Sequence, residues 1–131
     1  MSAYGFSITL QCSMDQVIKK VTEALKAEGF GVLTEINVKD VLKAKINVET
    51  RPYIILGACN PQSAHQALIV EPNIGLLLPC NVVIREEEDG SIAVVFMDPI
   101  AVLKLTDNPA IVTLAMEVRG KLERVRDTLK H

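Results

Sequence analysis

The chain has 131 residues, of which 49% are hydrophobic and 4% aromatic, and its formal net charge at pH 7 is −2. A chain of this length is expected to form one domain, here over residues 1–131, with an aliphatic core. Because 14 basic residues are interspersed with 16 acidic ones, the composition argues against nucleic acid and membrane surfaces as partners. No basic and then apolar leader follows Met1, and no apolar run approaches the roughly 18 residues of a membrane span. A cytoplasmic protein is therefore expected.

The first part of the chain alternates predicted strands and helices. Residues 4–10 alternate apolar with small or polar side chains, which is typical of a strand with one buried face. Ser13 and Gln16 have the spacing of a capping box, so a helix is predicted from there to Gly29, a residue suited to a C-terminal cap. Residues 30–36 are predicted to form a second strand, and Asn37 is placed to cap a short helix after it.

The remaining elements include a hairpin and a long final helix. Residues 53–59 predict a strand, and Asn60-Pro61 starts a helix over 61–70. Strands at 81–85 and 91–97 flank Asp89-Gly90, a strong hairpin signal. The strand at 92–97 is apolar on both faces, so its second face is expected to be covered within the chain or to meet a partner subunit. Helical segments open at Pro99 and Pro109, and the last runs over 109–130, where Gly120 predicts a close backbone approach.

These elements predict an α+β fold with two layers. Their order is β-α-β-α-β-α-β-β-α, and the five strands are expected to form a mixed, mostly antiparallel sheet with the helices packed on it. The high apolar content and the scarcity of large aromatic residues leave apolar surface exposed, so a homodimer is expected.

Cys59 and Cys80 are the most suggestive residues, because each lies where an apolar run meets a turn or a helix start. The three cysteines, at 12, 59 and 80, match neither a disulfide framework nor a zinc cluster and are expected to be reduced thiols. Cys59 precedes a predicted helix start, whose free N–H groups and dipole favour a thiolate or a bound anion. The alternative is that both cysteines are small buried hydrophobic residues at strand ends.

His65 lies about one turn into the same helix, where it could approach Cys59. With Cys80 it would make a set of three metal ligands, but the spacing matches no standard zinc pattern, so no metal is expected. A cysteine hydrolase would need a third group to orient His65, and Asp98, the one acid suited by position, is better explained as a helix N-cap. The catalytic set is incomplete, which favours a protein that is not an enzyme.

Several blocks occur in order along nearly the whole chain: Glu28-Gly29-Phe30-Gly31-Val32-Leu33, Cys59-Asn60-Pro61, Gly75-Leu76-Leu77-Leu78-Pro79-Cys80 and Glu88-Asp89-Gly90. With these blocks the chain resembles the domain-of-unknown-function 302 family. The resemblance implies a small prokaryotic α+β domain, a dimer, and no established biochemical activity. It also maps the family's signature cysteines onto Cys59 and Cys80 and leaves Cys12 outside the pattern.

The leading hypothesis is a cytosolic binding or accessory domain without a cofactor. Its candidate cleft for a small ligand or an anion involves Cys59, Asn60, His65 and Cys80. One alternative is a thiol-dependent redox protein in which Cys59 is the nucleophile and Cys80 the resolving partner. Another is a purely structural dimerisation domain that uses residues 75–78 and the strand at 92–97.

Overall fold

The computed structural model describes residues 3–130, so Met1, Ser2 and His131, at the ends of the expected domain, lie outside the described residues. Five strands form one sheet in the order β1-β5-β4-β3-β2, and every neighbouring pair is antiparallel. The strands are β1 (Gly5–Leu10), β2 (Gly31–Asn37), β3 (Tyr53–Cys59), β4 (Cys80–Glu86) and β5 (Ile92–Met97). The predicted α+β class and five-stranded sheet are confirmed, and the sheet is wholly antiparallel where a mixed one was expected.

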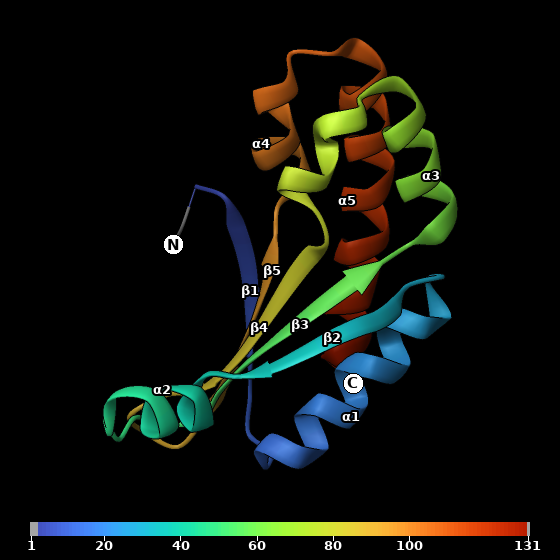
Figure 1. Ribbon diagram of the computed structural model, residues 1–131. Helices are drawn as coiled ribbons and strands as arrows, with labels where there is room; N and C mark the ends of the chain where they lie inside the picture. Colours follow the sequence, from blue (N-terminus) through green and yellow to red (C-terminus); the bar gives the residue numbers. More distant parts are fainter. Residues whose placement is uncertain (1–2, 131) are drawn as a thin grey trace.

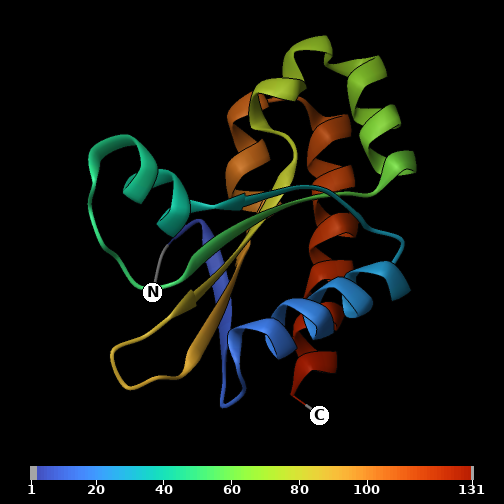
Figure 2. The same ribbon diagram turned by 60° about the horizontal axis from the view of Figure 1, so that its bottom comes forward.

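The helices lie mainly on one side of this sheet, where α1 and α5 run along its face (Figures 1 and 2). They are α1 (Met14–Ala27), α2 (Val38–Ile46), α3 (Pro61–Val70), α4 (Pro99–Leu103) and α5 (Pro109–Leu129), with 3-10 turns η1 (Pro72–Leu77) and η2 (Lys104–Thr106). In contrast, α2 projects from the end of β2, away from α1 and α5 (Figure 1). Among residues 3–130, no helix is both long and apolar enough to cross a membrane.

The local signals of the sequence fix the element ends. The predicted capping box at Ser13 and Gln16 is formed, and Gly29, at φ +86°, closes α1. There Phe30 N–H donates to the Leu25 carbonyl at 2.9 Å, which satisfies a carbonyl that the helix end would otherwise leave free. Asn60 caps α3 in the same way that Asn108 caps α5, each directly before a proline.

Two apolar clusters make up the core. The larger lies between the sheet and helices α1 and α5, and includes the stacked rings of Phe6 and Phe96, whose centroids are 5.4 Å apart. The smaller lies between α3, η1, α4 and α5 and contains Ala67, Ile74, Leu103, Ile111 and Ala115. Leu78 packs against both clusters. The two clusters therefore meet beside the start of β4.

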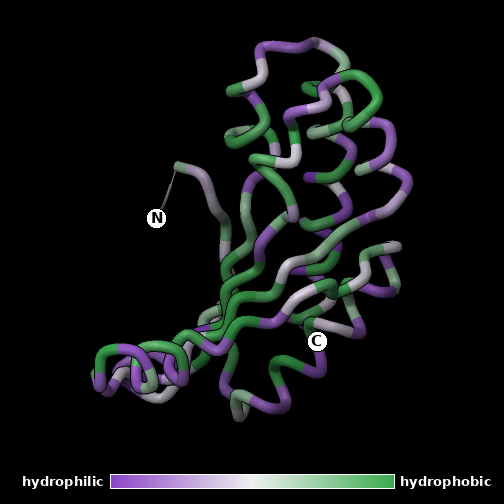
Figure 3. The backbone as a smooth tube through the Cα atoms, in the orientation of Figure 1, coloured by the Kyte–Doolittle hydropathy of each residue, from purple (hydrophilic) through white to green (hydrophobic). Residues whose placement is uncertain are grey.

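The second face of the sheet, opposite α1 and α5, is here called the open face. Strand alternation points Val94 and Phe96 of β5 into the core and Val95 onto the open face. A row of partly exposed aliphatic residues crosses this face in register, from Ile36 through Ile55 and Val83 to Val95. Figure 3 shows hydrophobic residues along the strands of this sheet. That β5 meets a partner subunit here remains a prediction.

The expected close approach at Gly120 is wrong. A Cβ atom built on this glycine would have as its nearest neighbour the Arg124 guanidinium, with Nη1 at 3.8 Å, which is an ordinary contact distance. The glycine therefore leaves a site on α5 where a larger residue fits without a clash.

Candidate functional site

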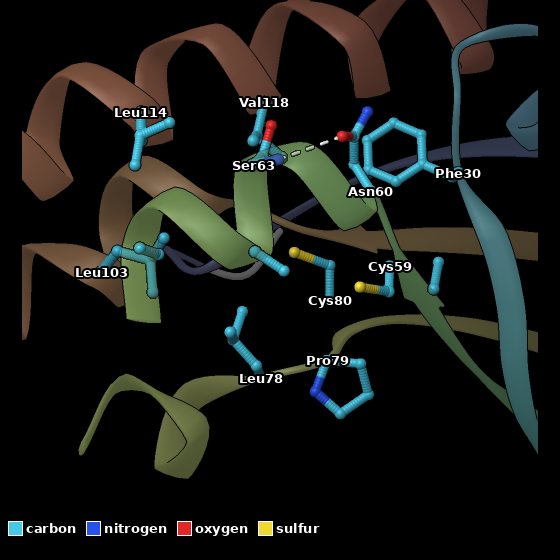
Figure 4. Close-up of a pocket in the computed structure, with 13 residues that line it drawn as sticks. Phe30, Cys59, Asn60, Ser63, Leu78, Pro79, Cys80, Leu103, Leu114 and Val118 are labelled. Atoms are coloured by element: carbon cyan, nitrogen blue, oxygen red, sulfur yellow. Dashed lines mark hydrogen bonds between the residues drawn. The ribbon is translucent and has the colours of Figure 1, made fainter. Parts of the chain in front are cut away.

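A cavity of about 50 Å³ lies where the two apolar clusters meet, between the end of β3, the start of β4 and helices α3 and α5. Apolar groups make up most of its wall: Phe30, Ala58, Ala64, Ala67, Leu78, Pro79, Leu103, Leu114 and Val118. The polar groups at its edge are Cys59, Asn60, Ser63 and Cys80. Figure 4 shows the two thiol groups side by side among these apolar side chains.

The two cysteines reach the cavity from neighbouring strands. Cys59 is the last residue of β3 and Cys80 the first of β4, and Cys80 pairs in register with Ala58. Both are free thiols, with Cys59 partly exposed and Cys80 buried. Burial, followed by the nearby Cys59, raises the pKa of Cys80 to about 11. At neutral pH the Cys80 sulfur is therefore a protonated, weakly polar group.

The start of α3 satisfies two of its first N–H groups through Asn60. The Asn60 side-chain oxygen accepts from Ser63 N–H at 3.2 Å, and the Asn60 carbonyl accepts from Ala64 N–H at 2.9 Å. Pro61 has no N–H to offer. Asn60 is itself only 9% exposed. This helix start consequently has few free donors for an anion, and the cavity beside it is mainly apolar.

The structure brings Cys59, Asn60 and Cys80 together but places His65 elsewhere. Ser63, Ala64 and Ala67 follow Asn60 at the spacing of one helical face and line the cavity. His65 falls outside this spacing, and its side chain is exposed on another side of α3. Helical periodicity applied to Asn60 could have found the three lining residues and set His65 apart.

Asp98, considered as a partner for His65, has a structural environment. Its carboxylate accepts from Ile100 N–H at 2.9 Å as the N-cap of α4 and pairs with the Arg119 guanidinium at 2.6 Å. The Arg119 guanidinium also lies over the Phe6 ring, 4.4 Å from its centroid. Within the described residues, no group of three or more histidine, cysteine or acidic side chains is arranged to hold a metal ion.

Four wall residues could not be read from the local sequence. Phe30 follows α1, Leu103 ends α4, and Leu114 and Val118 lie on α5, so long-range packing brings them to Cys59. They share only their apolar character with the rest of the core.

Comparison with known proteins gives a family for this arrangement. The family model described as "Domain of unknown function DUF302" matches residues 6–129. The chain belongs to the DUF302 family. A crystal structure of an uncharacterized conserved protein DUF302 from Bacillus stearothermophilus is similar, with a TM-score of 0.90 and 28% identity over 97% of this chain and 98% of that one. No curated protein matches the chain. The DUF302 assignment agrees with the predicted family and α+β fold, and it comes with no activity.

Proposed function

We propose that this DUF302 domain is a homodimeric, non-catalytic binding protein whose cavity at Cys59 and Cys80 takes a compact apolar group. One observation carries the proposal: two thiols and a largely apolar wall line a partly open pocket where two core clusters meet. A largely apolar pocket with a few polar groups is typical of a ligand site. The three free cysteines are in keeping with the reducing cytosol.

The size of the cavity limits its ligand. A cavity must offer roughly 10–15 Å³ to hold one water molecule, and this cavity offers about 50 Å³. A short alkyl group fits such a space, whereas a nucleotide or a large ring does not. Because Pro61 lacks an N–H and Asn60 already accepts from Ser63, a neutral alkyl group is favoured over an anionic one.

The test uses butan-1-ol and butanoate as matched probes, followed by NMR of the methyl groups. Butan-1-ol is expected to shift the Ala58 and Leu114 methyl signals in a saturable way, and butanoate at equal concentration is expected to shift them less. Ala64→Leu, which places a larger side chain in the cavity wall, should abolish the response. Ala27→Leu, at an exposed position of α1, is the control and should retain it.

Two results would count against this proposal. A stronger response to butanoate would assign the site to anions. Equal, non-saturable shifts in the native protein and in Ala64→Leu would mean that the space is a packing defect with no binding role.

Thiol redox chemistry is the second candidate, and the adjacency of Cys59 and Cys80 at one cavity favours it. In this reaction glutathione disulfide accepts two electrons, the two thiols lose their protons, and one intramolecular S–S bond forms. The raised pKa of Cys80 counts against it, because a protonated thiol attacks slowly and a high-pKa thiolate leaves slowly. Mass spectrometry of Cys12→Ser protein in glutathione buffers tests it: a Cys59–Cys80 peptide pair that forms and is lost reversibly as the glutathione ratio is varied would support redox function, and mixed glutathione adducts alone would exclude it.

A further inference from the structure

We infer that a second copy of this chain packs on the open face of the sheet, and that α2 of each copy borders this contact surface. The inference rests on the homodimer of the proposed function and assigns the surface that forms it. Four features of the described residues support it: the charge of the open face, the exposure of α2, the groove between them and the area available.

The open face carries little charge. By strand alternation, Arg85 is the one charged side chain that the five strands place on it, and its Nε pairs with Glu87 at 2.6 Å. Ile36, Ile55, Val83 and Val95 form the row across its middle. A sheet face exposed to water ordinarily alternates polar residues outward. This face therefore suits a partner that is itself nearly uncharged at the contact, such as the same face of a second copy.

Helix α2 is only partly covered within its own chain: it contacts β3, and its Val38 and Leu42 side chains are half-buried. It has nine residues, none of them buried, whereas isolated helices shorter than roughly 12–15 residues are marginal in water. Val41 is 40% and Ile46 63% exposed. Lys43 pairs with Glu49 at 2.9 Å in the segment that follows the helix, so its charge is compensated locally. A nonpolar surface on a partner would stabilise this helix by covering its apolar residues, while the charged Asp40 and Lys45 remain in water.

A groove joins α2 to the open face. Val38 and Leu42 of α2 line it on one side, and Tyr53 and Arg85 of the sheet on the other; charged Arg51 and Glu86 also line it and mark its polar rim. Tyr53 and Arg85 are also register partners on the open face. The surface of α2 and the open face are thus continuous. Each copy carries both, so in a two-fold dimer α2 of each copy can contact the open face of the other.

The area is of the order that a stable dimer needs. Five strands about 4.8 Å apart and about 20 Å long give the open face an area of roughly 500 Å² before side-chain relief is counted. A standard interface buries roughly 800 Å² of accessible surface on each partner. The open face alone therefore supplies the larger part of such an area, and the adjoining surface of α2 adds to it.

Sedimentation velocity across a concentration series tests the inference with two charge substitutions. Val83→Lys places an ammonium at the middle of the open face and should weaken dimerisation by more than about a hundredfold, because two unpaired charges become buried. Leu76→Lys adds the same charge on η1, where Leu76 is 86% exposed, and should leave the dimer unchanged. This control also tests the alternative interface at residues 75–78.

If Val83→Lys fails to fold, hydroxyl-radical footprinting of the native chain tests whether the open face is the dimer surface. Concentrating the protein should protect Tyr53 from oxidation and leave Met116, 60% exposed on α5, unprotected. A native chain that stays monomeric at every soluble concentration would overturn both the homodimer and this surface. A native dimer that dissociates in Leu76→Lys and persists in Val83→Lys, or one that protects Met116 in place of Tyr53, would overturn the surface alone and leave the homodimer standing.

Discussion

Gly57 on β3 is the glycine at which adding one methyl group should lower the free energy of unfolding most. A Cβ atom there would overlap Thr34 Oγ1 on β2 and would lie 2.9 Å from Cγ of the Pro79 ring. Thr34 Oγ1 can leave the overlap only by a change of χ1 rotamer, and the Pro79 ring at the cavity wall only by a shift of its backbone. Overpacking of this kind typically costs about 1–3 kcal/mol. Gly57→Ala is therefore expected to lower Tm by roughly 4–12 °C.

Gly31→Ala is the matched control, since it makes the same chemical change on β2. A Cβ atom at Gly31 has no neighbour within 4 Å and the backbone there is not left-handed. Losing the extra chain entropy of glycine should leave the free energy of unfolding unchanged or raise it by up to about 1 kcal/mol. Urea denaturation of both variants measures the difference directly.

A double-mutant cycle identifies the cause of the cost at Gly57. In the Thr34→Ala background one of the two overlaps disappears, so the cost of Gly57→Ala should fall by about 1 kcal/mol. The contact with Pro79 at 2.9 Å persists, and some of the cost should remain. If Gly57→Ala destabilises no more than Gly31→Ala, or if Thr34→Ala changes nothing, the steric reasoning is refuted.

Three further variants test helix composition, thiol burial and capping. Gly120→Ala should raise the free energy of unfolding by about 1 kcal/mol in urea melts, because the added methyl group has room on α5, and no gain would mean that the helix needs a glycine there. The pKa of Cys80 is raised to about 11, so folding favours its protonated form. The contribution of Cys80 to the free energy of unfolding is fully present below pH 9 and should fall by roughly 2–3 kcal/mol towards pH 11. Cys80→Ala, compared with the native protein at each pH, should lack this decline. Asp98→Ala removes the cap of α4 and the partner of Arg119, for an expected loss of about 1–3 kcal/mol in the same assay, and an unchanged midpoint would contradict the assigned cap.

Local signals explain why so much of the fold could be predicted. Ser13 with Gln16, Asn60 with Pro61, and Asp89 with Gly90 each act over two to four residues, and the structure forms the two helix starts and the turn at these places. Strand alternation likewise assigned Phe6 to the buried side of β1. Such devices depend on neighbours in the chain, so a single sequence contains them in full.

The open position of α2 could not be predicted, because it depends on what the rest of the chain does not cover. The spacing of Val38, Val41 and Leu42 indicates an amphipathic helix whatever surface it meets. The direction in which α2 leaves the end of β2 decides whether that surface belongs to the same chain or to another. The same sequence pattern describes a helix packed on its own core and one that reaches towards a partner.

The candidate site divides in the same way. Cys59 and Asn60 could be identified because they adjoin a helix start, whereas the space beside them exists only because two separate clusters meet there with the small side chains of Ala64 and Ala67 between them. Small residues in a sequence can mean close packing as readily as an opening, and only the distance between the elements that carry them separates the two cases. At this junction the elements stand far enough apart to leave a cavity. The thiol of Cys80, which the redox alternative makes the resolving partner, is held there as a neutral group in the cavity wall, which is in keeping with the proposed binding role.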